Sequence, residues 1–270
     1  MKTLYVSDLD GTLLRSDETI STYSAETLNA LTKKGMLFSY ATARSYHTAR
    51  KVTKGLEAKI PLIVYNGAFI LDNVSGEIMC SNYFGEEAKE ILDTFIQYGL
   101  YPIVYAYINN VEKFSFIWDK CSKGQTEFLE SRKGDVRTNI VTEAEQLYEG
   151  NIFYFTCIDE KEKLEPLYEK YKDMYHCVFQ KDIYSGEQWL EIMPAAVTKA
   201  NAIKQLQEYL SCDKVVVFGD AINDLEMFQA ADECYAVANA APELKEIATQ
   251  IIGGNNEDGV VKWLENNYDA

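Results

Sequence analysis

The amino-acid sequence predicts an α/β fold, in which a doubly wound and mostly parallel sheet of the Rossmann-like type is interrupted by an inserted α+β domain. Two observations lead to this prediction. Short apolar runs alternate with helical patterns in the first third of the chain and again in the last third, which is typical of parallel strands joined by helices. The chain of 270 residues is also longer than one compact core usually requires, so a second unit is expected.

The first third of the sequence predicts three strands separated by two helices. A buried strand at 4–6 stops at Asp8, and the helix that follows carries Leu28 and Leu31 on one face. Two lysines and Gly35 close that helix, since cations and glycine are favoured at helix C-termini. The remaining elements are a strand at 36–40, a helix at 45–54 and a strand at 62–65. This order favours parallel pairing with right-handed crossovers.

The last third of the sequence repeats this rhythm. Thr198 has the hydroxyl of an N-cap, and the helix after it turns Ala200, Ile203 and Leu206 inward. The run 215–218 is too apolar for any but a central strand. The other expected elements are a helix at 222–228, a strand at 235–238, a helix that begins at Pro242 and a terminal helix over 260–264.

The middle of the chain, from about Tyr83 to Gln188, has a different pattern. Strand patterns cluster there and polar residues alternate with aromatic ones, with helical patterns at 86–97 and 160–172 among them. These features predict an α+β domain inserted into the doubly wound one. We therefore expect a first domain of residues 1–82 plus 189–270 and an inserted domain of residues 83–188.

Composition and charge limit the classes of function. With 26 basic and 42 acidic residues the formal charge is −16, so the surface would repel both nucleic acid and anionic membranes. The sequence has no signal-peptide pattern, no apolar stretch of membrane-spanning length and no CxxC pair among its six cysteines, which favours a cytoplasmic protein with reduced thiols. Two histidines are too few for a histidine cluster, so carboxylates are expected to carry the chemistry. We expect a monomer or a weak homodimer.

The first candidate motif is the run Asp8-Leu9-Asp10-Gly11-Thr12 at the carboxyl end of the first strand. Ligands of open α/β sheets bind beyond these strand ends. Two carboxylates at positions i and i+2 can bind a hard cation, supply a nucleophile and exchange a proton with a leaving group. The alternative is an Asx-turn that merely ends the strand.

Two further candidates are ambiguous when each is taken alone. Thr42-Ala43-Arg44 follows the second strand and precedes a helix, where a hydroxyl and backbone amides could bind phosphate. A plain N-cap with an arginine at the surface is the simpler interpretation of that run. Lys199 lies in the first turn of its helix, where a cation is unfavourable unless an anion is bound nearby. A solvated lysine is the alternative there.

The last candidate motif is the segment 219–224, GDAIND, which follows the most apolar strand. Asp220 lies at a strand end, and Asn223 and Asp224 follow one helical turn later. An N-cap explains Asp220 but not the three clustered polar side chains. Because the carboxyl ends of parallel strands meet at one edge of a sheet, we expect Asp8 and Asp220 to come together.

Taken in order, these segments resemble the four motifs of the haloacid dehalogenase (HAD) superfamily, namely DLDGT at 8–12, Thr42, Lys199 and GDAIND at 219–224. The long insertion, Asn66-Gly67-Ala68 and Asn239-Ala240 are similar to the Cof-type branch, which carries a type-C2 cap. The resemblance implies an HAD core with a C2-type α+β cap. It also implies a magnesium-dependent phosphatase that hydrolyses small phosphorylated metabolites, often sugar phosphates, through an aspartyl-phosphate.

The resemblance also implies a role for each matching residue. Asp8 would be the nucleophile, and Asp10 would be the general acid and base. The Mg²⁺ ligands would be Asp8, the backbone carbonyl of Asp10 and Asp220, with Asp224 in support or bound through water. The phosphoryl oxygens would be held by the Leu9 and Ala43 amides, Thr42, Lys199 and Asn223. The family usually has glycine where this chain has Ala43, Ala200 and Ala221, and we expect φ at Ala43 to stay negative.

Two other functions stay open at this point. A sugar phosphomutase of the same superfamily would use the same nucleophile, and a non-catalytic regulator would bind a sugar phosphate without turnover. The leading expectation for the partner is a small phosphorylated metabolite. In the inserted domain or directly beside it, Trp189, Tyr184 and Tyr154 could stack on a sugar, although packing in the domain's own core is the simpler interpretation.

Overall fold

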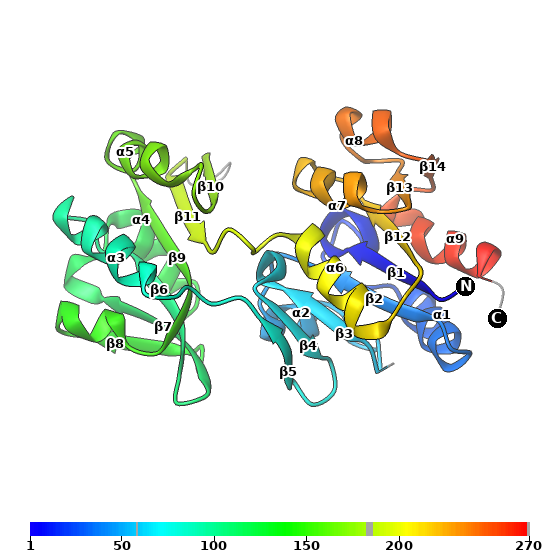
Figure 1. Cartoon of the computed structure of the whole chain (residues 1–270), viewed down its shortest axis with the longest axis horizontal. Coiled ribbons are helices and arrows are strands. Elements are labelled where there is room, and N and C mark those ends of the chain that lie inside the picture. The colour runs from blue at the N-terminus through cyan, green and yellow to red at the C-terminus, as the bar shows by residue number, and fades with distance from the viewer. Residues whose placement is uncertain (58, 182–185, 269–270) are drawn as a thin grey trace. The chain divides into compact units, whose positions relative to one another are not determined.

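The structure is a computed structural model that describes residues 1–57, 59–181 and 186–268. The chain divides into two compact units. The first contains Met1–Ser81 together with the chain from Val197 onward, and the second contains Asn82–Ala196. Figure 1 shows the helices and strands of both units. None of the helices in the described part of the chain combines the length and the hydrophobicity needed to cross a lipid bilayer.

The first unit is built on an eight-stranded sheet with the strand order β14-β13-β12-β1-β2-β3-β4-β5. The strands from β14 to β3 are parallel, and β4 and β5 extend the sheet as antiparallel strands. The bounds are β1 (Thr3–Asp8), β2 (Leu37–Ala41), β3 (Pro61–Val64), β4 (Phe69–Asp72), β5 (Ile78–Ser81), β12 (Lys214–Gly219), β13 (Glu233–Val237) and β14 (Gln250–Ile252). The predicted fold class, a mostly parallel α/β sheet, is confirmed.

The helices of the first unit lie on both faces of this sheet. They are α1 (Thr22–Lys33), α2 (Tyr46–Val52), α6 (Lys199–Leu210), α7 (Leu225–Ala230), α8 (Pro242–Ile247) and α9 (Gly259–Asn267). The crossovers through α1 and through α7 run in opposite directions along the sheet, so right-handed connections put these two helices on opposite faces. Helix α9 packs against α1, and α6 packs against α7.

Local sequence explains where helix α6 begins. The hydroxyl of Thr198 accepts a hydrogen bond from the N–H of Asn201 at 3.1 Å, as an N-cap does, so this prediction is confirmed. Strand β12 is buried from Val215 to Gly219, in agreement with its apolar sequence and central position. Both features fix the chain segments that carry Lys199 and Asp220.

The second unit contains a six-stranded sheet with the order β10-β11-β9-β6-β7-β8, antiparallel except for the pair β7–β8. The strands are β6 (Ile103–Ile108), β7 (Val111–Ile117), β8 (Thr138–Val141), β9 (Asn151–Asp159), β10 (His176–Lys181) and β11 (Gln188–Met193). The helices are α3 (Glu87–Gln97), α4 (Lys123–Glu130) and α5 (Lys161–Tyr171). Apolar residues of α3, α5 and the sheet form one core, which includes Phe95, Phe155, Leu164 and Leu190.

Both predicted boundaries differ from the structure, the first by one residue and the second by eight. The sequence places the return to the first domain at residue 189, whereas residues 189–196 group with the second unit. The reason is strand pairing, because β11 pairs with β9 and β10 along its whole length. The first boundary, predicted between residues 82 and 83, lies between Ser81 and Asn82.

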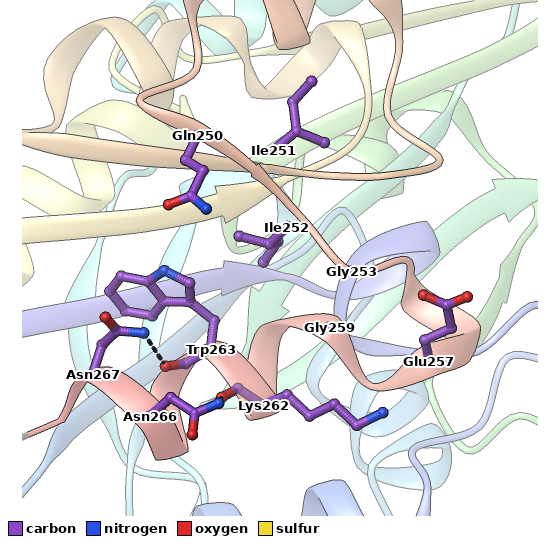
Figure 2. Close-up of a pocket in the computed structure, with 10 residues that line it drawn as sticks. All are labelled: Gln250, Ile251, Ile252, Gly253, Glu257, Gly259, Lys262, Trp263, Asn266 and Asn267. Carbon is purple, nitrogen blue, oxygen red and sulfur yellow. Dashed lines mark hydrogen bonds between the residues drawn. The ribbon is translucent and has the colours of Figure 1, made fainter.

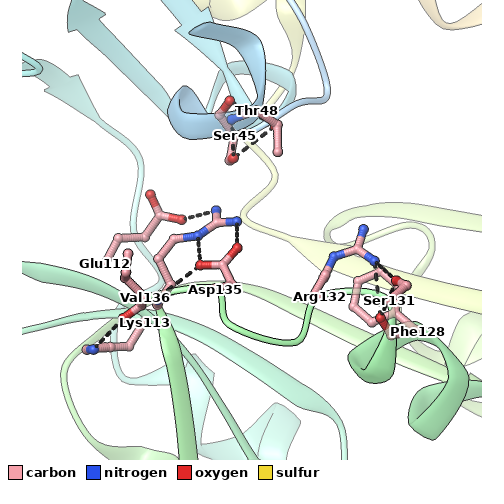
Figure 3. A network of polar contacts seen from close by, with 10 residues as sticks. Ser45, Thr48, Glu112, Lys113, Phe128, Ser131, Arg132, Asp135 and Val136 are labelled. Atoms are coloured by element: carbon pink, nitrogen blue, oxygen red, sulfur yellow. Dashed lines mark hydrogen bonds and ion pairs between the residues drawn. The ribbon is translucent and has the colours of Figure 1, made fainter. Parts of the chain in front are cut away.

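A buried ion-pair network lies at β7 and the start of β8 in the second unit (Figure 3). The guanidinium of Arg137 donates from Nη1 to Glu112 Oε1 at 2.7 Å. It also donates from Nε and Nη2 to the two oxygens of Asp135, at 2.9 and 2.6 Å. The side chains of Arg137 and Glu112 are each only 7% exposed, so their charges are largely removed from water and depend on one another.

Arg137→Met is expected to destabilise the protein by about 3 kcal/mol, because Glu112 and Asp135 lose their cation while Glu112 stays buried. The measurement is the free energy of unfolding in urea. Lys133→Met, at an exposed position of the same loop, is the matched control and should change stability by less than about 0.5 kcal/mol. Equal stabilities of the two variants would contradict the assigned dependence of these carboxylates on Arg137.

Candidate active site

The strand order of the first unit changes direction at β1. Strands β2 and β3 follow on one side of β1, whereas β12 and β13 lie on its other side. Ligands of doubly wound sheets bind at the carboxyl ends of the strands at such a switch point. Strand β1 ends at Asp8, and its parallel neighbour β12 ends at Gly219, one residue before Asp220. The two acids therefore lie at the same edge of the sheet.

Three carboxylates gather at this edge. One oxygen each from Asp8, Asp220 and Asp224 lie within 4.8 Å of one another. Asp8 and Asp224 are 6% and 0% exposed, and Asp220 is half-buried. The expectation that Asp8 and Asp220 come together is confirmed, and an isolated Asx-turn does not account for this grouping.

Lys199, the first residue of α6, supplies a buried cation to the cluster. Its Nζ donates to Asp8 Oδ1 at 2.5 Å and to Asp224 Oδ1 at 2.7 Å. Only 4% of its side chain is exposed, which excludes the alternative of a solvated lysine. Residues from three separate segments of the sequence are thus joined through one ammonium group.

The turn after β1 brings Asp220 close to the backbone. This turn, η1 (Leu9–Leu13), contains Gly11 at φ +77°, and a Cβ atom on Gly11 would lie 2.3 Å from Asp220 Oδ2. Thr12 Oγ1 donates to the other oxygen, Asp220 Oδ1, at 2.9 Å. On the outside of the turn, Asn239 Nδ2 donates to the Gly11 carbonyl at 2.7 Å. Only glycine combines this backbone conformation with this close approach.

Asp224 organises the other side of the cluster. Its Oδ2 accepts the backbone N–H groups of Asp220 and Ala221, at 3.0 and 3.2 Å, while its Oδ1 accepts from Lys199. Both of its oxygens are therefore already hydrogen-bonded. The arrangement fixes the backbone at Asp220 and the ammonium of Lys199 relative to each other.

Burial changes the acidity of these groups. Desolvation raises the pKa of Asp8 to about 8, with Lys199 opposing the rise and Asp224 adding to it. Desolvation also raises the pKa of Asp220 to about 6, against a hydrogen bond from Thr12. Burial lowers the pKa of Lys199, but Asp8 and Asp224 outweigh it and raise that pKa above its ordinary value. Lys199 therefore stays positively charged. Its single charge cannot neutralise three carboxylates when all of them are ionised.

Thr42 follows β2 in a loop that is held by the turn η2 (Tyr65–Gly67). The N–H of Asn66 donates to the Thr42 carbonyl at 2.9 Å, and that of Tyr65 donates to the Arg44 carbonyl at 3.0 Å. Tyr65, Asn66 and Gly67 have φ values of 51°, 55° and 106°, so three successive residues are left-handed. Strained backbone of this kind persists where the surrounding structure requires it.

The same turn touches the beginning of α6. A Cβ atom on Gly67 would lie 2.4 Å from the carbonyl oxygen of Thr198, the residue before Lys199. The turn η2 therefore fills the space between the Thr42 loop and the helix that carries the buried cation. This contact explains the glycine of the sequence motif at 66–68, because only glycine fits at position 67 beside the Thr198 carbonyl.

Gly67→Ala is expected to displace the start of α6 and to reduce any turnover that depends on Lys199 at least tenfold, because a shift of about 1 Å in a group that acts on a substrate costs about 10²-fold. Gly99→Ala is the matched control. Gly99 also has a positive φ, but a Cβ there meets nothing within 4 Å, so the control carries the backbone cost without the contact. Comparison of kcat for the two variants at equal thermal stability tests whether the contact of Gly67 with Thr198 positions α6. Equal losses of kcat in the two variants would contradict this role.

Asp10 and Arg44 form a contact that the sequence analysis missed. The Asp10 carboxylate lies outside the group of three acids and accepts from Arg44 Nε at 2.9 Å and Nη2 at 2.6 Å. Arg44 is partly exposed, as the simpler interpretation expects, but it is bound to a carboxylate and is therefore not a plain surface arginine. The signal available was its position two residues after Thr42, but a pair 34 residues apart in the chain has no local pattern.

The remaining predicted residues have the following positions. The Leu9 side chain is buried, while Ala43 and Asn223 are exposed near the strand ends. Ala43 does not have positive φ, as expected, so the missing glycine causes no backbone strain. Trp189 packs edge-on against Phe128, and the ring centroids of Tyr154 and Tyr105 are 5.0 Å apart. These contacts favour core packing for Trp189 and Tyr154. Tyr184 lies outside the described residues.

The carboxylate cluster fits a small divalent cation. Two oxygens bound to one Mg²⁺ lie at most about 4.2 Å apart, twice a metal–oxygen distance of about 2.1 Å, so the observed 4.8 Å limit needs only a slight contraction. Within the described part of the chain, Asp8 Oδ2 and Asp220 Oδ2 accept no hydrogen bond. Two acidic oxygens are therefore available to a hard cation, which would also offset the excess negative charge.

The cavity drawn in Figure 2 is separate from this cluster. It has a volume of about 350 Å³, lies between β14 and α9, and is lined by residues that include Gln250, Ile252 and Trp263. None of the candidate site residues lines it. The candidate site is therefore the carboxylate cluster at the strand ends and not this cavity.

The fold and the site define a known class of protein. A family model described as haloacid dehalogenase-like hydrolase matches residues 5–264, so the chain belongs to this family of hydrolases. The predicted superfamily and the prediction of an enzyme are confirmed.

Individual relatives cover nearly the whole chain. The 5-amino-6-(5-phospho-D-ribitylamino)uracil phosphatase YitU of Bacillus subtilis is 26% identical, over 97% of this chain and 96% of its own length. A second Bacillus subtilis protein of the same description, YwtE, is also 26% identical, over 96% and 95%. The crystal structure of TM0651 from Thermotoga maritima matches with a TM-score of 0.80 and 27% identity, covering 100% of this chain and 99% of that one.

Proposed function

We propose that this protein is a magnesium-dependent phosphatase that hydrolyses small phosphorylated metabolites, with sugar phosphates as the expected class, through an aspartyl-phosphate on Asp8. The observation that carries the proposal is the buried Lys199–Asp8 ion pair within a cluster of three carboxylates at the end of β1. The two Bacillus subtilis relatives named as phosphatases of a phosphorylated ribityl compound support this class of substrate. No observation favours the phosphomutase or the non-catalytic regulator.

In the first half of the reaction Asp8 attacks phosphorus. Its carboxylate, held by Lys199 through Oδ1, forms the new O–P bond while the bond from phosphorus to the leaving oxygen breaks. Asp10 gives a proton to the leaving oxygen. A phosphate dianion repels a carboxylate, so Lys199 must offset the charge, with help from the Thr42 hydroxyl, Asn223 and the amides of Leu9 and Ala43.

In the second half of the reaction water cleaves the aspartyl-phosphate. Asp10, now ionised, takes a proton from water, which attacks phosphorus and releases inorganic phosphate, and Asp8 is restored. A Mg²⁺ held by Asp8, Asp220 and the Asp10 carbonyl, with Asp224 in support, would supply further charge cancellation when bound. The first unit is proposed as the catalytic core and the second as the inserted cap that selects the substrate.

The test is phosphate release from a panel of phosphorylated metabolites, which includes sugar phosphates and a phosphorylated ribityl compound. Release is expected with Mg²⁺ and is expected to stop with a chelator. Asp8→Asn serves as the blank for contaminating phosphatases. No release above this blank from any substrate would overturn the proposal.

Mg²⁺ affinity is expected to increase with pH. The raised pKa of Asp8, about 8 without metal, means that below pH 8 a proton must leave before the carboxylate binds the cation. One coupled proton weakens apparent affinity about tenfold for each pH unit below 8, and Asp220, with a pKa of about 6, steepens the loss below pH 6. Calorimetric titration with Mg²⁺ in two buffers of different ionisation enthalpy measures the released protons. Constant affinity from pH 6 to pH 8 would contradict this coupling.

A further inference from the structure

The guanidinium of Arg44 donates hydrogen bonds to both oxygens of the Asp10 carboxylate. Arg44 Nε lies 3.1 Å from Asp10 Oδ1 and 2.9 Å from Oδ2, and Nη2 lies 2.6 Å from Oδ1. A carboxylate oxygen has two lone pairs. Oδ1 accepts from two nitrogens, whereas Oδ2 accepts from one, which leaves an Oδ2 lone pair on the side away from Arg44.

The same arginine belongs to the loop that carries Thr42. Its N–H donates to Thr42 Oγ1 at 3.1 Å, and its carbonyl accepts from the N–H of Tyr65. The backbone of Arg44 is therefore fixed by the proposed phosphate loop and by the turn η2. The backbone of Arg44 is thus held by the Thr42 loop, while its guanidinium binds the proposed acid/base carboxylate of Asp10.

Stability alone does not explain this contact. The side chains of Asp10 and Arg44 are 47% and 23% exposed, and ion pairs this open to water contribute at most about 1 kcal/mol. Arg44 Nη2 also contacts Glu18 Oε2 at 2.8 Å, so two carboxylates share one guanidinium. What a fork of this kind provides is orientation, because two donors in a fixed plane define where both oxygens of an exposed carboxylate lie.

We propose that Arg44 is a positioning residue that couples the Thr42 loop to the acid/base carboxylate of Asp10. The inference rests on the proposed function. Arg44 holds Asp10 by Oδ1 and by one lone pair of Oδ2. The remaining position on Oδ2 carries the proton that passes to the leaving oxygen in the first half-reaction, and once free it accepts a proton from water in the second. Without the two donors of Arg44, the exposed side chain of Asp10 in the turn η1 rotates among several rotamers, and the fraction of molecules with a correctly oriented carboxylate falls.

The experiment compares Arg44→Ala and Arg44→Lys with the unmodified protein, using an alkyl phosphate and nitrophenyl phosphate. Single-turnover release of the leaving group isolates the first half-reaction. We expect Arg44→Ala to slow release from the alkyl phosphate 10- to 100-fold, with KM within threefold, and to slow release from nitrophenyl phosphate much less, because nitrophenolate needs no proton. Arg44→Lys keeps the charge but cannot fork, so its alkyl phosphate rate is expected to remain at least fivefold low.

A double-mutant cycle separates positioning from direct contact with substrate. In an Asp10→Asn background Arg44→Ala is expected to slow release less than twofold further, because there is no carboxylate left for the arginine to orient. Arg50→Ala, at an exposed position of α2, is the control for loss of a nearby cation and should leave kcat unchanged.

Three results would overturn the inference. They are equal slowing of both substrates by Arg44→Ala, full additivity with Asp10→Asn, and full recovery by Arg44→Lys. Failure of the proposed function has a different signature, since Asp8→Asn would then retain activity whatever residue stands at 44. Thermal unfolding of each variant checks that the compared proteins are equally folded.

Discussion

Asp8→Asn is expected to reduce turnover about 10⁴-fold or more without unfolding the protein, because an amide cannot form the covalent bond to phosphorus. The side chain keeps its shape and its oxygen can still accept from Lys199, which lies 2.5 Å from Asp8 Oδ1. Burial penalises the charge of Asp8, whose pKa is raised to about 8. At pH 8 without metal the variant should therefore unfold at the same temperature as the unmodified protein or higher.

Two measurements check this result. They are kcat on the best substrate of the panel and thermal unfolding with a chelator present. Asp213→Asn is the matched control, since Asp213 is an exposed carboxylate that accepts the backbone N–H of Lys2 and lies just before β12, at the opposite end of that strand from Asp220. Retention of more than about 1% of activity by Asp8→Asn would exclude covalent catalysis at this position.

Lys199→Met is expected to have the second large effect, and it acts on activity and on stability together. Removing the ammonium leaves Asp8 and Asp224 buried without their shared cation, which costs about 3–5 kcal/mol unless protonation relieves part of it. Turnover should fall about 10³-fold, because the charge that offsets the phosphoryl group is lost.

Urea unfolding and kcat measure the two effects separately. Lys204→Met, at an exposed position of the same helix α6, is the matched control and should change neither quantity appreciably. A double variant with Asp8→Asn should regain part of the lost stability, since one of the stranded charges is then removed. A Lys199→Met protein as stable as the unmodified one would contradict the assigned electrostatics.

Most of the core fold could be predicted from the sequence, since each long element has a strong local pattern. Strand β12 is uniformly apolar and α6 has both an N-cap and an apolar face, so each was recognisable alone. The strands β4, β5 and β14 were not predicted. They have three or four residues each, which is too short for a periodic signal, and among the core strands of this length only β3 was predicted, from its apolar run.

The carboxylate cluster was predictable for a different reason, namely topology. Parallel strands that neighbour each other must end at the same edge, so Asp8 and Asp220 meet although 211 residues separate them in the chain. The pairing of Arg44 with Asp10 was not predictable, because it depends on side-chain directions in two loops and leaves no periodic trace. The left-handed conformation of Tyr65 was hidden for a similar reason, since tyrosine rarely adopts it and only tertiary packing imposes it.

The position of β1 between β2 and β12 has a consequence for the synthesis of the chain. Domains generally fold as units while a polypeptide emerges from the ribosome. Here β1 is made early, but one of its two neighbours, β12, begins only at Lys214, after the whole of the second unit has been translated. Until the second unit has been made, β1 has an open edge, and the nascent chain contains neither Lys199 nor Asp220, which the proposed catalytic centre requires.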